Sequence, residues 1–90
     1  MSTMIDVHKP RPGELEALGT ADWPIWTCEP SRFAWSYDER ETCHVLAGEV
    51  TVETADGAVS FGAGDVVVFP QGLDCTWIVH RAVRKHYRFG

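Results

Sequence analysis

The strongest constraint on the fold of this 90-residue chain is the run from Gly64 to Cys75, which places an apolar segment between two glycine turns. Residues 66–69 are valines and a phenylalanine, and β-branched and aromatic residues favour extended strands. Pro70 and Gly72 follow at once. Proline lacks a backbone N–H and glycine tolerates positive φ, so the pair indicates a tight turn. The run therefore predicts a short buried strand whose two ends are set by backbone geometry.

The remainder of the chain repeats this pattern. From about residue 33 onward, short apolar runs are separated by turn signals roughly every 8 to 12 residues, which is typical of a β-sandwich or barrel. Gly48 indicates a sharp reversal, and Asp56-Gly57 indicates a hairpin with a type I′ turn, which needs positive φ at both central residues. We expect an all-β fold with seven or eight strands from residue 25 onward. They include residues 33–37, 43–46, 50–54, 59–61, 66–69, 75–79 and 83–89.

The size of the chain predicts one domain with a thin core, because a domain this small buries only about 60% of its unfolded surface. The chain has four Trp, four Phe and two Tyr, which is a large number of aromatic residues for a core of this size. We therefore expect a homodimer in which a partner covers an apolar strand face. Residues 1–22 hold no apolar run long enough for a signal peptide or a membrane span, so we interpret them as an N-terminal arm of a cytoplasmic protein with no membrane partner. Residues 23–90 form the single domain.

The net charge of −5 argues against a nucleic-acid partner, because phosphate binding depends on clustered basic residues. Basic residues do gather near the C-terminus. Alternation along a last strand places Arg84, His86 and Arg88 on one face, and Lys85 on the other face among apolar and aromatic neighbours. We interpret the basic face as a solvated edge, with anion binding as the alternative.

Two stretches resemble the signature motifs of the cupin superfamily, G-x5-H-x-H-x3,4-E-x6-G and G-x5-P-x-G-x2-H-x3-N. Glu41 and Gly48 match the end of the first motif, and the glycines and proline at positions 64, 70 and 72 match the second. Cys75 stands where the second motif has histidine. The resemblance implies a cupin-type double-stranded β-helix, a jelly-roll barrel.

A closer resemblance connects residues 23–89 with the small single-domain cupins. Residues 33–43, 69–73 and 83–87 are similar to the pattern shared by the cupin portions of ureidoglycine aminohydrolases and of the ethanolamine-utilisation cupin. The members of this group differ in function, and many have no assigned activity. The resemblance therefore implies a fold more firmly than a reaction.

In metal-binding cupins the motif glutamate and histidine meet at a metal, so the resemblance implies that Glu41 and Cys75 approach each other inside the barrel. Cys43 lies two residues after Glu41 and shares its strand face. Neither alignment of the first motif supplies a histidine, and a hard carboxylate with a soft thiolate rarely holds a divalent ion without help. We predict no cofactor and no tightly bound metal. The alternative is a manganese, zinc or iron ion held by Glu41 and Cys75.

The candidate site is a barrel mouth that binds a small molecule. Aromatic walls with one carboxylate suit an uncharged or cationic organic ligand, and burial among rings should keep the thiols protonated. The leading hypothesis is metabolite binding. The alternative is an isomerase or an aminohydrolase-like enzyme that acts on a small metabolite and uses Glu41 as its catalytic acid or base, with or without a metal. The third possibility is that these residues only pack the core. The candidate ligand-binding residues are Trp35, Tyr37, Glu41, Cys43, Cys75 and Trp77.

Overall fold

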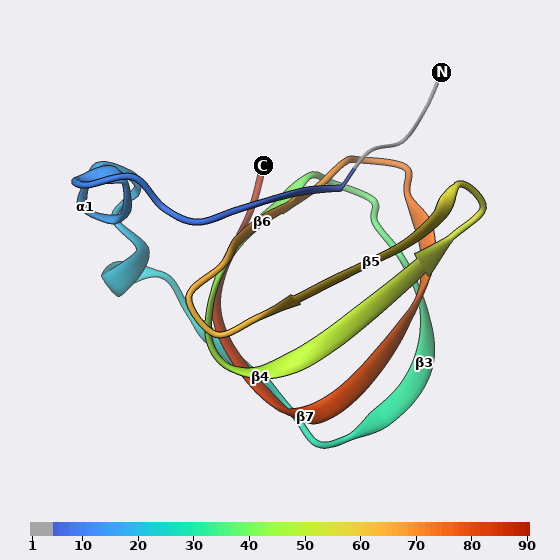
Figure 1. Cartoon of the computed structure of the whole chain (residues 1–90). Coiled ribbons are helices and arrows are strands. Elements are labelled where there is room, and N and C mark those ends of the chain that lie inside the picture. Colours follow the sequence, from blue (N-terminus) through green and yellow to red (C-terminus); the bar gives the residue numbers. More distant parts are fainter. Residues whose placement is uncertain (1–4) are drawn as a thin grey trace.

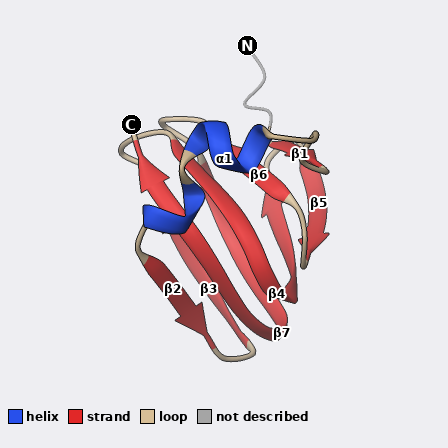
Figure 2. Cartoon of the chain, turned by 90° about the vertical axis from the view of Figure 1, so that its left-hand side faces the viewer, coloured by secondary structure: helices blue, strands red, loops and turns tan. Residues whose placement is uncertain are grey.

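The computed structural model describes residues 5–90, in which seven strands form one hydrogen-bonded antiparallel sheet that curls into a barrel (Figure 1). The helix α1 (Glu14–Leu18) and the 3-10 helix η1 (Thr20–Asp22) connect the first two strands (Figure 2). Neither of these described helices has the length or apolarity to cross a membrane. The predicted all-β fold is confirmed. Its strands are β1 (Asp6–His8), β2 (Ile25–Cys28), β3 (Ser31–Ser36), β4 (Glu41–Thr54), β5 (Gly57–Gly62), β6 (Val66–Phe69) and β7 (Asp74–Phe89).

The two longest strands, β4 and β7, pair with each other along most of their length and belong to both halves of the barrel. In one half, the second part of β4 pairs with β5 and the first part of β7 pairs with β3. In the other half, the first part of β4 pairs with β6 and the second part of β7 pairs with β2. Register shifts between Val45 and Val50 mark bulges, and bulges bend a strand pair. The two halves therefore face each other across the core, as expected for a jelly roll.

The reversal predicted at Gly48 is wrong. Strand β4 runs through this glycine, and β7 is also unbroken, so six strands rather than seven or eight follow residue 25 in the described chain. Gly48 has a φ of 107°, and a Cβ atom there would lie 2.6 Å from the carbonyl oxygen of Ala82. Glycine is required at this position because β7 approaches closely at a bulge, not because the chain turns back.

The hairpin between β4 and β5 is confirmed, but its turn differs from the predicted type. Thr54 pairs with Gly57, so the two loop residues are Ala55 and Asp56. Among the described residues, only glycines have positive φ. A type I′ turn needs positive φ at both loop residues, so this loop does not form one.

The described part of the predicted N-terminal arm adds a strand to the barrel. Strand β1 pairs with β6, with Val7 opposite Val67. Residues 1–4 of the arm lie outside the described residues. The boundary at residue 22 stays a prediction.

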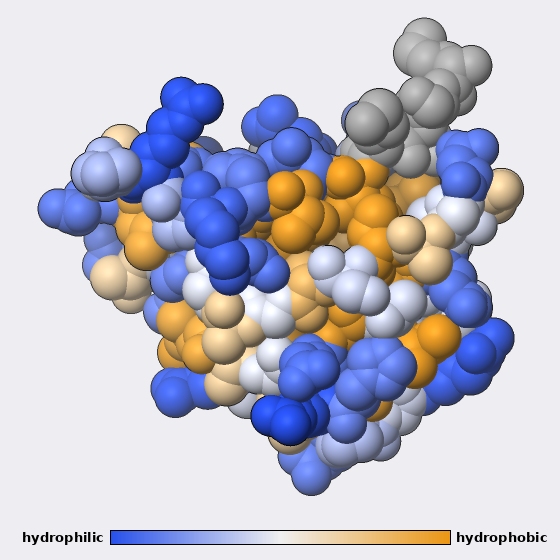
Figure 3. All heavy atoms as spheres, in the orientation of Figure 1, coloured by the Kyte–Doolittle hydropathy of each residue, from blue (hydrophilic) through white to orange (hydrophobic). Residues whose placement is uncertain are grey.

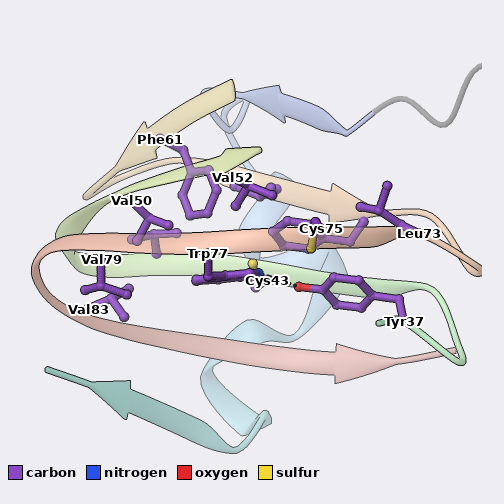
Figure 4. Packing of buried hydrophobic residues seen from close by; sticks show 13 residues of the cluster. Tyr37, Cys43, Val50, Val52, Phe61, Leu73, Cys75, Trp77, Val79 and Val83 are labelled. Atoms are coloured by element: carbon purple, nitrogen blue, oxygen red, sulfur yellow. Dashed lines mark hydrogen bonds between the residues drawn. The ribbon is translucent and has the colours of Figure 1, made fainter. Parts of the chain in front are cut away.

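The core lies between the two halves of the barrel and has an aromatic and an aliphatic part (Figure 4). In the aromatic part, Tyr37 stacks on Phe69 with ring centres 4.8 Å apart, and Phe61 meets Trp77 edge to face at 5.7 Å. Such pairs add about 0.5–1.5 kcal/mol each beyond the area they bury. The aliphatic part consists mainly of Val45, Val50, Val52, Val67, Leu73, Val79 and Val83.

Candidate functional site

An aromatic pocket of about 220 Å³ lies between the two halves of the barrel. Its lining comes from β2, from β3 and the residue that follows it, from the start of β4 and from both ends of β7. Seven of the nine lining residues are aromatic, so a ligand would contact ring surfaces on most sides. The lining residues are Trp26, Phe33, Trp35, Tyr37, Glu41, Trp77, Lys85, Tyr87 and Phe89.

The pocket has an exposed rim and a buried floor. At the rim, Trp35 is 48% exposed and Phe89 is 42% exposed. The polar groups of the floor, Glu41 and Lys85, are 4% exposed each. A ligand entering past the rim would therefore lose most of its water before it met the two charges.

Strand alternation explains how the rings reach the pocket. Phe33 and Trp35 on β3, and Tyr37 just after it, are spaced by two residues and therefore point to the same side. The same spacing on β7 directs Lys85, Tyr87 and Phe89 inward. Aromatic and small residues alternate over positions 33–37, which accounts for the three rings of this pocket wall.

Glu41 and Lys85 form a buried ion pair in the pocket floor. The Lys85 Nζ donates to both carboxylate oxygens of Glu41, at 3.3 Å to Oε1 and 3.2 Å to Oε2. Each side chain is only 5% exposed. Removing an ion from water is unfavourable, so each charge depends on the other for compensation.

Aromatic rings surround the Lys85 ammonium group. Its Nζ lies 4.6 Å from the ring centre of Trp77, 5.0 Å from that of Trp26 and 5.8 Å from that of Phe69. The negative faces of these rings stabilise a cation. An ammonium has three protons, and in the described residues its hydrogen bonds go only to Glu41, which leaves one proton for a pocket ligand.

Tyr37 supplies a second donor. The Trp77 Nε1–H donates to the Tyr37 hydroxyl oxygen at 3.2 Å, so the hydroxyl acts as an acceptor there and keeps its own proton for another partner. Burial, with the Glu41 carboxylate nearby, raises the pKa of Tyr37 well above its usual range. The hydroxyl therefore stays protonated and can donate to a ligand.

The two candidate thiols lie in the core rather than in the pocket lining (Figure 4). Burial raises the pKa of the Cys43 thiol to about 12 and that of the Cys75 thiol to about 11. The Cys75 Sγ–H donates to the Trp35 carbonyl at 3.5 Å. Both thiols are therefore protonated at neutral pH, as the sequence led us to expect. Of the six candidate site residues, the four others line the pocket.

The donor set around Glu41 does not fit a divalent metal. Both of its oxygens accept from Lys85, and a protonated Cys75 thiol is a poor ligand. In residues 5–90, no three His, Cys, Asp or Glu side chains are grouped as metal ligands. The ammonium group instead neutralises the carboxylate, so the floor no longer favours a cationic ligand over an uncharged one.

Lys85 is the floor residue that the sequence reasoning did not select. The sequence did contain an indication that Lys85 faces the core, because alternation places this lysine on the same strand face as Val83, Tyr87 and Phe89. A single charge on an otherwise apolar face needs a buried partner. Its partner lies 44 residues away along the chain, and no local pattern indicated which acid it would be. Four aromatic lining residues were also not among the predicted site residues: Trp26, Phe33, Tyr87 and Phe89.

Comparisons with known proteins agree with this fold. The family model of the EutQ-like cupin domain matches residues 15–87. A DUF861 family protein from Thermotoga maritima is 45% identical, with a TM-score of 0.94 over 97% of this chain and 100% of that chain. A putative ethanolamine utilization protein Q from Salmonella typhimurium is 26% identical, with a TM-score of 0.67 over 72% of this chain and 53% of that chain.

The EutQ protein of Clostridium difficile is 20% identical, with a TM-score of 0.67 over 72% of this chain and 52% of that chain, and this likeness supports the fold alone. The chain thus spans about half the length of the EutQ proteins. No curated protein sequence matches it significantly. The family match over most of the chain, together with the Thermotoga maritima structure, shows that this protein belongs to the EutQ-like cupin domain family.

Proposed function

We propose that this protein binds a small uncharged organic molecule in the aromatic pocket, through an oxygen atom of the ligand. The observation that carries the proposal is the Glu41–Lys85 pair in the floor of a pocket that opens at an exposed aromatic rim. A core that only filled space would not need two charges at this position, because apolar residues of similar volume are often equally stable there.

The size of the pocket favours a small metabolite. Its volume of about 220 Å³ lies below the range of about 300–1,000 Å³ typical of pockets for drug-sized ligands. The rings offer flat surfaces for an apolar or aromatic body. The remaining Lys85 proton and the Tyr37 hydroxyl proton suit an oxygen acceptor, such as a carbonyl or a hydroxyl group.

Benzyl alcohol is a suitable probe, because it joins an aromatic ring to a single hydroxyl group. We expect saturable shifts in two-dimensional NMR spectra that are strongest for the indole N–H signals of Trp26 and Trp77. Trp35→Ala, at the rim, should weaken binding. Ile25→Ala is the matched control, because Ile25 is 43% exposed but does not line the pocket. Shifts that never saturate, or that persist equally in Trp35→Ala, would contradict the proposal.

Catalysis by Glu41 is the second candidate function. It is favoured by the direct contact between the carboxylate and the Lys85 ammonium, which gives a proton a path between two groups in the pocket floor. The reaction class would be isomerisation or hydrolysis of a small polar metabolite. Glu41→Gln keeps the shape and removes the ionisation. If the variant captured ligand as the wild type does at every pH, general acid or base chemistry at Glu41 would lose its support.

We also propose a homodimer. Apolar side chains reach the surface on the face that Figure 3 shows. Ile5, which precedes β1, and Val59 of β5 line a depression of the surface. A partner covering this face would bury apolar surface that a thin core leaves exposed. Light scattering should give twice the chain mass, and Val59→Glu should give a monomer. A wild-type monomer at micromolar concentration would refute the dimer. The cytoplasmic location and the absence of nucleic-acid and membrane partners stay predictions.

A further inference from the structure

We propose that Lys85 is a nucleophile that forms an imine with small aldehydes or ketones bound in the pocket. This inference rests on the proposed binding function and names the chemical class of the ligand as a carbonyl compound. It goes beyond binding, because it assigns a covalent step to one atom, the Lys85 Nζ.

The geometry supplies the three groups that such a step needs. Lys85 lines the pocket, and its Nζ lies 4.6 Å and 5.0 Å from the ring centres of Trp77 and Trp26, which line the pocket as well. The Glu41 Oε2 lies 3.2 Å away, within reach of an ammonium proton. The protonated Tyr37 hydroxyl lines the same pocket and can donate to the carbonyl oxygen. A nucleophile, its base and a donor to the developing oxyanion therefore converge on one space.

The reaction balances without an oxidant or a reductant. The Lys85 ammonium transfers a proton to Glu41, and the freed nitrogen lone pair forms a bond to the carbonyl carbon while the C=O π electrons move to oxygen. A second nitrogen proton reaches that oxygen, which gives a carbinolamine. Protonated Glu41 then returns its proton to the hydroxyl group, water leaves, and the nitrogen lone pair forms the C=N bond. One ammonium and one carbonyl thus yield one iminium and one water, with Glu41 again a carboxylate.

The same surroundings stabilise the product. An iminium nitrogen at the Lys85 position keeps the positive charge, the Glu41 counter-ion and the neighbouring faces of Trp26 and Trp77. The reacting carbon would lie among rings, in a site of low water content. Once the released water has left the pocket, the low water content of the site slows hydrolysis of the imine.

The chain contains its own control, because it has only two lysines. Lys9 is 72% exposed and pairs with Asp65 at the surface. Wild-type protein treated with benzaldehyde and sodium cyanoborohydride, which reduces an imine to a stable amine, can be digested and analysed by mass spectrometry. We expect Lys85 to gain one benzyl group at least about tenfold faster than Lys9, with saturation as the pocket fills. Benzyl alcohol, which cannot form an imine, should compete with this labelling.

Variants test the role of each group. Lys85→Arg should abolish labelling at position 85, and Glu41→Gln should slow it by about 10²-fold, the contribution of one general base. Ile25→Ala should label as the wild type does. Labelling of Lys85 no faster than that of Lys9, in a protein whose pocket benzyl alcohol saturates, would overturn the imine and leave binding intact. Failure of both benzaldehyde and benzyl alcohol to enter the pocket would overturn the proposed function as well.

Discussion

Two ion pairs join the same two strands, β4 and β7, in contrasting surroundings. The pair Glu41–Lys85 has an N–O distance of 3.2 Å and side chains that are 5% exposed. The pair Glu49–Arg81 has a similar distance of 3.1 Å, but its glutamate is 56% exposed and its arginine 78% exposed. The contact distance is nearly the same, so the difference between the pairs is burial.

Burial changes what each pair does. Water screens the exposed pair, and such pairs contribute about 0–1 kcal/mol to stability. The buried pair has left water, and among residues 5–90 its charges are held by each other and by the aromatic rings. The outer pair can therefore be lost with little consequence. The inner pair gives the pocket a polar floor, and each of its charges depends on the other for compensation.

The largest effect is expected when one member of the buried pair is removed. Glu41→Met or Lys85→Met alone should lower the free energy of unfolding by about 3–5 kcal/mol, because each leaves an uncompensated buried charge. The double variant should regain most of this loss. Urea denaturation of the four proteins measures the coupling directly. Singles that each lose less than the double variant would show that the two charges do not compensate each other.

A much smaller effect is expected at the exposed pair. Glu49→Gln or Arg81→Met should change the free energy of unfolding by at most about 1 kcal/mol. This contribution should disappear near 1 M salt, where screening acts over about 3 Å, while the coupling of Glu41 and Lys85 should persist. Denaturation series at low and high salt compare the two pairs. Equal salt dependence would remove the distinction drawn from burial.

The smallest effect is expected at a third, titratable cluster on the N-terminal segment. His8 contacts Glu14 and Asp6 at 2.7 Å each, and hydrogen bonds to these two carboxylates raise its pKa. A raised folded pKa stabilises the protein below the unfolded value of about 6.5, and this contribution is lost as pH rises through the folded pKa. His44 acts in the opposite sense, because burial lowers its pKa.

The comparison of wild type with His8→Asn isolates this contribution. The variant should be less stable than the wild type near pH 5.5, and the difference should shrink as the pH rises through the folded pKa of His8. Thermal unfolding at the two pH values measures the difference. A stability gap that is the same at both pH values would show that the contacts of His8 do not depend on its charge.

Much of the fold could be predicted because its signals are local. Alternation with a period of two assigns side chains to strand faces, and it correctly grouped Trp35 and Tyr37 on a pocket wall. Burial of the face that carries Glu41 and Cys43 follows from the same rule. The glycine and proline between β6 and β7 also marked a strand end correctly, because their backbone preferences do not depend on distant contacts.

The errors and omissions arise where distant segments meet. A glycine at position 48 is equally compatible with a turn and with a bulge when only the neighbouring sequence is considered. The close approach of Ala82 on β7 decides in favour of the bulge. Cys43 and Cys75 lie in the core and not in the pocket, because the curvature of the sheet determines which inward side chains reach the open end.

The amino-acid sequence by itself therefore determined the fold class, most of the strand faces and the aromatic character of the barrel mouth. Only the tertiary structure decided that Lys85 neutralises Glu41 and that the thiols are excluded from the pocket. The physical reason is the separation along the chain of the residues that interact. Backbone preference and alternation act over a few residues, whereas the register and bulges of two strands bring together the members of a buried ion pair that are 44 positions apart in the chain.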